Sequence, residues 1–169
     1  MRVTLRVLAL SDVPAHNAGE DDRTVRWLTG GYGTIESTTR WFAQLAGNAR
    51  TGQGARGFGV CLDDRLAGYV EGNPDVRDGL DDGDVNISYA VHPWARGRGV
   101  AVEAVGLMRA FLRDQRIGTR AAIRVEPENV ASVRVAVKSG FRHVRDFVSR
   151  TDTHPDGSPA GMRLYVHDL

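Results

Sequence analysis

The strongest constraint on the fold is a short turn, rich in glycine and arginine, that joins a strand-like segment to a helix-like one. Alternating residues 85–91 precede the turn Arg96-Gly97-Arg98-Gly99, and residues 100–114 follow it with helical periodicity. Glycines let a backbone turn sharply and approach a ligand closely. The first N–H groups of a helix are unpaired donors at the positive end of its dipole. The turn therefore predicts a seat for a phosphate, with arginine charge beside it, and indicates a ligand that carries a pyrophosphate.

Two other phosphate-binding turns fit this sequence less well. A dinucleotide-binding turn starting at Gly97 and Gly99 would need a small residue in place of Val102, and it should lie near the start of a βαβ unit. This turn lies past mid-chain, and residues 118–122 do not supply the acid that should follow. A Walker loop needs Gly-Lys-Ser/Thr, which the sequence lacks.

The turn instead resembles a signature of the GNAT family, the acetyl-CoA-dependent N-acetyltransferases. Arg96-x-x-Gly99-x-Ala101 is similar to the Arg/Gln-x-x-Gly-x-Gly/Ala motif of that family. Farther along the chain, Asn129-x-x-Ser132 begins a second helical segment, which ends at residues 138–141, Lys-Ser-Gly-Phe. That second pattern resembles GNAT proteins of the RimJ/RimL type, and both motifs appear in the order expected of the family.

The resemblance implies an α/β (α+β) fold with a single N-acetyltransferase domain over residues 1–169. Its central sheet would be mixed, mostly antiparallel and of six to seven strands, with helices on both faces. In this family the strand before the phosphate turn splays from the next strand at a bulge, and the cofactor lies in the opening. Main-chain groups of residues 89–91 would then hold the thioester carbonyl like an oxyanion hole. The cofactor-binding residues expected for acetyl-CoA are Tyr89, Ala90, Val91, Arg96, Gly97, Arg98, Gly99, Val100, Ala101, Asn129 and Ser132.

Catalytic groups are less clearly marked. Many family members use a tyrosine of the second motif as the acid that protonates the departing thiolate, but Ala136 stands at that position. Ser132 matches the serine that assists the sulfur in the RimL type, or is a first-turn hydroxyl of the helix. Glu71, Asp84 and Asp152 are the candidate bases, and solvent could serve through a water chain.

The strand before the turn has one polar face. Asp84, Asn86, Ser88 and Ala90 alternate with apolar residues, and a central strand covered on both sides should be apolar on both. This pattern predicts a solvated cleft beside the phosphate turn. Tyr89, on the other face, is interpreted as a packing residue.

Composition limits the class of protein. The chain has 169 residues, of which 41% are hydrophobic and 25% charged, values typical of a globular domain. We expect its one cysteine, Cys61, to be a buried thiol, and with no leader or membrane span visible we expect a cytoplasmic protein. The five histidines lack ligand spacing, so no metal site is predicted.

Charge is distributed unevenly. The net charge of +1 gives no reason to expect nucleic-acid or membrane binding. Residues 1–90 hold 13 acids and 9 bases, whereas residues 91–169 hold 8 acids and 13 bases. The basic half contains the phosphate turn, which suits an anionic cofactor. The acidic half, and within it the loop of Asp75, Asp78, Asp81 and Asp82, favours a cationic amine.

Elsewhere, periodicity and turn residues predict the remaining elements. The expected strands are residues 3–10, 57–62, 66–73, 84–92, 121–125, 141–150 and 162–167, and the expected N-terminal helices are residues 12–28 and 35–49, parted by glycines 30, 31 and 33. The strands 57–62 and 66–73 should form a hairpin that turns at Asp63-Asp64.

The function implied by the resemblance is transfer of an acetyl group from acetyl-CoA to a primary amine, by direct attack in a ternary complex. The acceptor would be a peptide or protein N-terminus or a small-molecule amine. The alternative is a non-catalytic acyl-CoA-binding sensor or regulatory module, and a nucleotide-binding oxidoreductase is disfavoured. The identity of the amine, the acyl chain length and the oligomeric state, monomer or homodimer, stay open.

Overall fold

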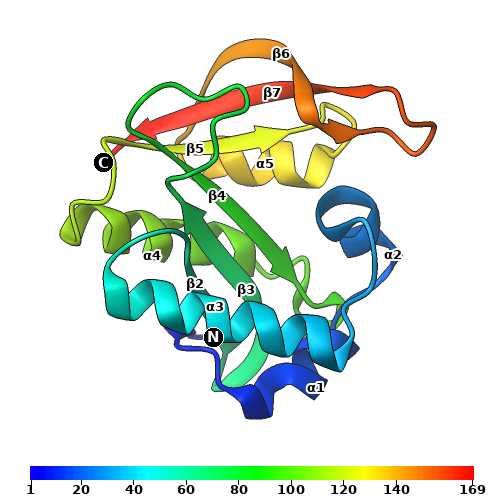
Figure 1. Ribbon diagram of the computed structural model, residues 1–169, viewed down its shortest axis with the longest axis vertical. Helices are drawn as coiled ribbons and strands as arrows, with labels where there is room; N and C mark the ends of the chain where they lie inside the picture. Colours follow the sequence, from blue (N-terminus) through cyan, green and yellow to red (C-terminus); the bar gives the residue numbers. More distant parts are fainter.

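The computed structural model describes all residues 1–169 and joins seven strands in one sheet of order β1-β2-β3-β4-β5-β7-β6 (Figure 1). Every neighbouring pair is antiparallel except β4 and β5, which run parallel. The predicted mixed, mostly antiparallel sheet is therefore confirmed. The strands are β1 (Val3–Arg6), β2 (Arg56–Leu62), β3 (Arg65–Asn73), β4 (Asp84–Val91), β5 (Arg120–Val125), β6 (Arg142–Thr153) and β7 (Pro159–Asp168).

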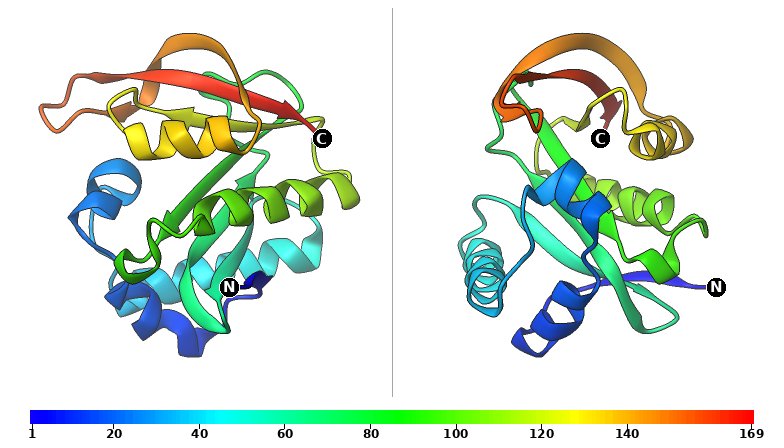
Figure 2. Two further views of the ribbon diagram at one scale, coloured as in Figure 1. Left: turned by 180° about the vertical axis from the view of Figure 1, so that it is seen from behind. Right: turned by 90° about the vertical axis from the view of Figure 1, so that its right-hand side faces the viewer.

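Helices cover both faces of the sheet, with α3 on one side and α4 and α5 on the other (Figure 2). The main helices are α1 (Val13–Ala18), α3 (Ile35–Thr51), α4 (Val100–Asp114) and α5 (Val130–Lys138). The apolar stripe of α4 lies in a core cluster of 18 buried residues, whereas α1 and α3 share a second cluster of five. None of the helices combines the length and the apolar character that a bilayer span requires.

The β2–β3 hairpin matches its sequence signal. Asp63 and Asp64 both adopt left-handed backbone angles, with φ of 47° and 67°. Two such residues in a two-residue loop match the right-handed twist of the flanking strands, which explains why short polar residues stand there. Cys61 lies buried in β2 beside this turn, as expected.

The N-terminal segment differs from its sequence prediction. The expected helix 12–28 ends after α1, with Gly19 as the C-cap. A Cβ at Gly19 would lie 2.2 Å from the ring of His92, so this position requires glycine. The chain restarts as a short helix, α2 (Asp22–Thr24), which is capped by Asp21 and continues into a π-helical turn, η2 (Val25–Thr29). The strand expected over residues 3–10 ends at Arg6, before a 3-10 turn at Leu10–Asp12.

Strands β4 and β5 pair over only three residues and then diverge. Asp84–Asn86 pairs with Arg120–Ala122, whereas the rest of β4 has a partner on the β3 side alone. The two arrows separate toward their C-terminal ends in Figure 1. The predicted splayed pair is thus confirmed, but the bulge expected in β4 is absent, because its register with β3 is unbroken from Asn86 to Val91.

Candidate active site

A cavity of about 560 Å³ occupies the opening between β4 and β5 and is lined by residues of both strands, of α2 and η2, and of α4 and α5. Residues of both faces of β4 line it: Asn86, Ser88 and Ala90 of the predicted polar face, and Ile87, Tyr89 and Val91 of the other. Of the residues expected to bind the cofactor, Arg98 alone does not contribute to the wall. The others all do: Tyr89, Ala90, Val91, Arg96, Gly97, Gly99, Val100, Ala101, Asn129 and Ser132.

The main-chain groups of β4 divide between its two sides. The N–H of His92 donates to the carbonyl of Ala67, and the carbonyl of Ala90 faces Gly68, so the peptide groups of residues 90 and 92 point to β3. By the alternation of antiparallel ladders, those of Tyr89 and Val91 point into the opening. The family resemblance implies cofactor contacts for all three residues 89, 90 and 91. The main chain of Ala90 is occupied by β3 and cannot contact the cofactor, whereas the N–H groups of Tyr89 and Val91 can.

The phosphate turn has the predicted backbone. Gly97 and Gly99 adopt φ of 74° and 79°, and a Cβ at either position would meet no atom within 4 Å. Gly99 is the N-cap of α4, and no side chain caps this 15-residue helix. The first N–H groups of α4 therefore face open space beside two glycines, an arrangement that suits an anion.

Arg96 does not have the role that the sequence suggested. Its two terminal nitrogens donate to Asp21 at 2.6 and 2.8 Å, and its Nε donates to the carbonyl of Val91 at 2.8 Å. The hydrogen bond with Arg96 is the main cause that holds the pKa of Asp21 well below its usual range. Arg96 thus ties the turn to α2 rather than offering a free charge to a phosphate. Arg98 is exposed and makes no ion pair, so its charge is available.

The start of α5 brings the second motif to the opposite wall. Asn129 is the N-cap, and its Oδ1 accepts from the N–H of Ser132 at 3.2 Å, which leaves the side-chain NH₂ of Asn129 without a protein partner. The hydroxyl of Ser132 lies 2.8 Å from that of Tyr89, which comes from β4. Tyr89 was interpreted as packing only; its position among apolar strand residues gave no signal of this contact.

The three candidate bases have different surroundings. Asp84 is a correction: its side chain is 0% exposed, receives hydrogen bonds from Arg120 at 2.7 and 2.9 Å, and does not line the cavity. A carboxylate closed in an ion pair is not available to an amine, so Asp84 has a structural role. Its place on the polar face of β4 suggested otherwise because the sequence does not show which residue of β5 lies beside it.

Glu71 lies next to the cavity without lining it. It pairs across the strands with Ser88, a wall residue, and accepts from Trp41 Nε1 at 3.2 Å. Burial raises the pKa of Glu71 above its ordinary value. Trp41 also lines a second hollow of about 390 Å³ on the α3 side of the sheet.

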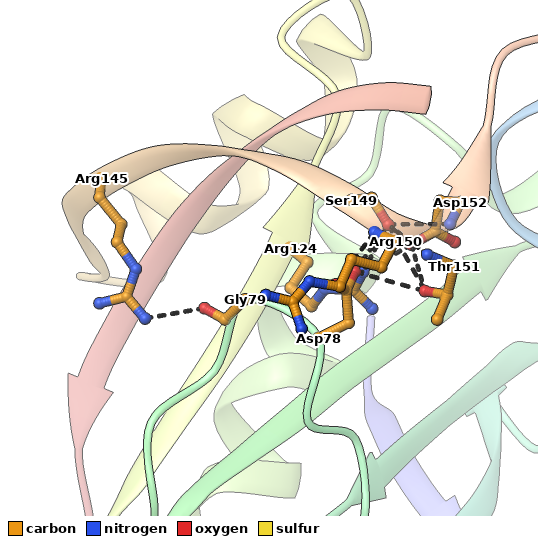
Figure 3. A network of polar contacts seen from close by, with 8 residues as sticks. All are labelled: Asp78, Gly79, Arg124, Arg145, Ser149, Arg150, Thr151 and Asp152. Atoms are coloured by element: carbon orange, nitrogen blue, oxygen red, sulfur yellow. Dashed lines mark hydrogen bonds and ion pairs between the residues drawn. The ribbon is translucent and has the colours of Figure 1, made fainter. Parts of the chain in front are cut away.

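Asp152 is the candidate base that reaches the cavity wall. Its carboxylate accepts from Arg124 and from Ser149, and its side chain is 46% exposed (Figure 3). Arg124 also binds Asp78 at 2.6 Å. The Oγ of Ser149 lies within hydrogen-bond distance of both carboxylates, and its single proton serves one of them at a time. Nothing in the sequence pointed to Arg124, which fixes this network from near the C-terminal end of β5.

Two of the four carboxylates of the acidic loop between β3 and β4 are neutralised. Asp78 pairs with Arg124, and Asp81 pairs with Arg120 and Arg145. The loop thus holds β5 and β6 in place, and the suggestion that its charge attracts a cationic substrate loses its basis for these two carboxylates.

Two buried polar atoms of the cavity wall have no protein partner. They are Oδ1 of Asn86, an acceptor, and Nε of Arg124, a donor. Both atoms are closed off from solvent, so they add an unfavourable term to the stability of the wall and are not exposed to a ligand in the cavity.

Fold and cavity together define an acyltransferase with a wedge-shaped cofactor cleft, and the comparisons with known proteins agree. The sequence matches the acetyltransferase (GNAT) domain family over residues 2–142. No curated protein matches it. The chain belongs to the GNAT family, whose members are acetyl-CoA-dependent N-acetyltransferases.

Several solved structures share the fold at low sequence identity. RimL, a ribosomal alpha-N-protein acetyltransferase in complex with coenzyme A, superimposes with a TM-score of 0.82 at 16% identity, covering 99% of this chain and 94% of that one. RimJ of Mycobacterium smegmatis, in complex with a CoA disulfide, gives 0.82 at 22% identity, covering 99% and 82%. The microcin self-immunity acetyltransferase MccE, in complex with acetyl-CoA and AMP, gives 0.80 at 15% identity, covering 99% and 92%. The resemblance to the RimJ/RimL type is therefore confirmed for the fold.

Proposed function

We propose that the protein transfers an acetyl group from acetyl-CoA to a primary amine, in a ternary complex formed in the cavity between β4 and β5. The observation that carries this proposal is the wedge itself. A parallel strand pair opens after three paired residues, and the opening leads to an uncapped helix start with two glycines in the left-handed region. The GNAT motifs lie on the walls of this opening.

The pyrophosphate of the cofactor would be bound by the first N–H groups of α4, at the Gly97–Ala101 turn, with Arg98 adding charge. The NH₂ group of Asn129 and the main chain of Tyr89 and Val91 suit the amide-rich pantetheine arm. Basic residues Arg134 and Lys138 also line the cavity on the α5 side. Coenzyme A is anionic at its phosphate end, so these charges are placed to attract it.

At the thioester, the two N–H groups of β4 that point into the opening would stabilise negative charge on the carbonyl oxygen as the amine attacks. Ser132, on the opposite wall, is our candidate for the proton donor to the departing thiolate. Asp152 is our first candidate for the group that removes a proton from the attacking ammonium, directly or through water, because it is the one proposed carboxylate on the cavity wall. Glu71 is our second candidate for this base; it lies on β3 next to Ser88 of the cavity wall.

The acceptor is a primary amine that enters beside β5 and β6. The RimL and Salmonella typhimurium structures are named for acetylation of a ribosomal protein, the latter at its N-terminal serine. We favour a peptide or protein N-terminus as the acceptor on the strength of these two structural neighbours.

Two measurements on one purified protein test the proposal. Calorimetry with CoA should show binding, and release of free thiol from acetyl-CoA should depend on an added amine. The amines would be a short peptide with a free N-terminus, the same peptide with a blocked N-terminus, and a polyamine. CoA binding without thiol release for any amine would indicate the non-catalytic acyl-CoA sensor, and absence of CoA binding would contradict both functions.

A further inference from the structure

Tyr89 and Ser132 form a contact between two elements that are far apart in the sequence. The phenol oxygen of Tyr89, in β4, lies 2.8 Å from Oγ of Ser132 and 3.4 Å from the carbonyl oxygen of Ser132, in the first turn of α5. Both residues line the cavity between β4 and β5. The contact thus crosses the opening in which the thioester is proposed to bind.

Either hydroxyl of this contact can donate, because each carries one proton and each oxygen can accept. In the orientation that serves proton transfer to the cavity, the Tyr89 proton is directed at Oγ of Ser132. The N–H of Ser132 is held by Asn129, and its Oγ has no protein partner besides Tyr89. In that orientation the Ser132 hydroxyl proton is left for a group inside the cavity.

We infer that Tyr89 is the positioning residue that makes Ser132 an effective proton donor to the leaving sulfur. The inference rests on the proposed function. As the carbon–sulfur bond breaks, its electron pair stays on sulfur, and sulfur takes the Ser132 hydroxyl proton. The Ser132 oxygen receives the Tyr89 proton in turn, and Tyr89 regains a proton from solvent, which has received the one lost by the amine.

This arrangement answers a chemical difficulty. An isolated serine hydroxyl is a weak acid, and the charge that develops on its oxygen needs a donor beside it. Tyr89 supplies that donor. Burial raises the pKa of Tyr89 to about 12, so its hydroxyl keeps its proton throughout the neutral range. Many family members carry a tyrosine at the position of Ala136, one turn after Ser132, and that residue is buried here. In this protein the tyrosine beside Ser132 comes instead from β4.

A double-mutant cycle tests the inference. The variants are Tyr89→Phe, Ser132→Ala and the two combined, with Tyr165→Phe as the control, because Tyr165 is a buried tyrosine outside the cavity whose hydroxyl has no side-chain hydrogen bond. We expect kcat to fall about 10-fold or more in Tyr89→Phe, with KM for acetyl-CoA nearly unchanged, and about 100-fold in Ser132→Ala. The double variant should match Ser132→Ala, because Tyr89 acts through that hydroxyl.

A second readout separates proton transfer from packing. Replacing Tyr89 by a fluorinated tyrosine keeps the ring and the hydroxyl but makes the phenol more acidic, so the alkaline limb of the kcat profile should move to lower pH. This arm also remains informative should Tyr89→Phe prove unstable in a thermal melt. A Tyr89→Phe protein with parental kcat, additive losses in the double variant, or an unmoved pH profile would each overturn the inference. A parent protein that releases no thiol with any amine would instead overturn the proposed function and this inference with it.

Discussion

Arg96 donates hydrogen bonds to Asp21 from both of its terminal nitrogens. This ion pair joins the phosphate-binding turn to the start of α2, 75 positions earlier in the chain. Both side chains are largely buried, with exposures of 26% and 29%. The third donor of the guanidinium holds the carbonyl of Val91. One arginine therefore sets the relative positions of β4, the turn and the helix that closes the cavity mouth.

We predict that Arg96 and Arg98 have separable roles. Arg96→Lys cannot reproduce the two-pronged contact and should lower the free energy of unfolding by about 1–2 kcal/mol. Arg98→Ala should leave the thermal melt unchanged and weaken CoA binding, more so at low salt, because its charge is exposed. Melting curves and calorimetry on the two proteins check this. Equal loss of CoA affinity in Arg98→Ala at high and low salt would contradict a charge effect.

Gly99 should be intolerant of a negative charge. Gly99→Asp places a carboxylate beside the first N–H groups of α4, where it would cap the helix and repel a phosphate, so CoA affinity should fall about 100-fold or more. The side chain itself meets no atom within 4 Å. Gly99→Asn, of the same size but neutral, is the matched control and should lose much less. Calorimetry that gives the two variants the same affinity would remove the phosphate from this turn.

Asn129 offers a cleaner test of a dual role. Its Oδ1 caps α5, and its NH₂ is free. Asn129→Asp keeps a capping oxygen but loses the donor, whereas Asn129→Ala loses both. We expect the aspartate variant to keep its stability and lose cofactor affinity, and the alanine variant to lose about 1 kcal/mol of stability as well. Unchanged acetyl-CoA kinetics in Asn129→Asp would show that the residue is a helix cap only.

The parts of this molecule that were predictable from sequence are those set by neighbouring residues. The turn at Gly97–Gly99, the helix Val100–Asp114 and the hairpin at Asp63-Asp64 all follow from periodicity and from glycine or aspartate at positions of unusual φ. By contrast, the need for glycine at residue 19, where α1 ends, comes from the distant ring of His92, which no local pattern places there.

The same distinction holds within the site. Residue types at motif positions indicated which residues would line the cavity, but not which partner each would have. The sequence does not show that Asp21 lies beside Arg96, so Arg96 looked free to bind a phosphate. Nor does it show that Arg120 lies beside Asp84, so Asp84 looked free to act in catalysis. The Tyr89–Ser132 contact spans 43 positions and needs both the splay of β4 and the start of α5 to form. No local pattern encodes such a contact.

The three carboxylates considered as bases should separate on mutation. Asp152→Asn should lower kcat and leave CoA affinity unaffected, because Asp152 lines the cavity near the proposed acceptor. Asp84→Asn should lower stability by about 1–2 kcal/mol, since it removes a charge-assisted contact of Arg120, which keeps its pair with Asp81. The pH dependence of kcat decides between Asp152 and Glu71. If Glu71 is the base, its raised pKa should place the acidic limb of the profile above the ordinary range of a carboxylate, and Glu71→Gln should abolish that limb.

His16 should make folding stability dependent on pH below neutrality. Its ring is packed among Trp41, Phe42 and Tyr69, its residue is 5% exposed, and its Nδ1 has no partner. Burial, helped by the nearby His92, lowers the pKa of His16 to about 4, and Asp12 opposes the shift only in part. The unfolded chain takes up a proton near pH 6.5 that the folded protein refuses until about pH 4, so this residue destabilises the fold as the pH falls through that interval.

The contribution of His16 should reach about 3 kcal/mol at the acidic end of this interval. Carboxylates add their own pH dependence there, so the measurement is the difference in unfolding free energy between the parent and His16→Phe, which keeps an aromatic ring in the cluster. We expect this difference to move in favour of the variant from pH 7 to pH 4 in urea titrations. The control is His143→Gln, which replaces a half-exposed histidine paired with Asp146. This variant should not gain stability over the parent from pH 7 to pH 4. Parallel stability curves for the parent and His16→Phe would mean that the buried ring is protonated in the folded protein as readily as in the unfolded chain.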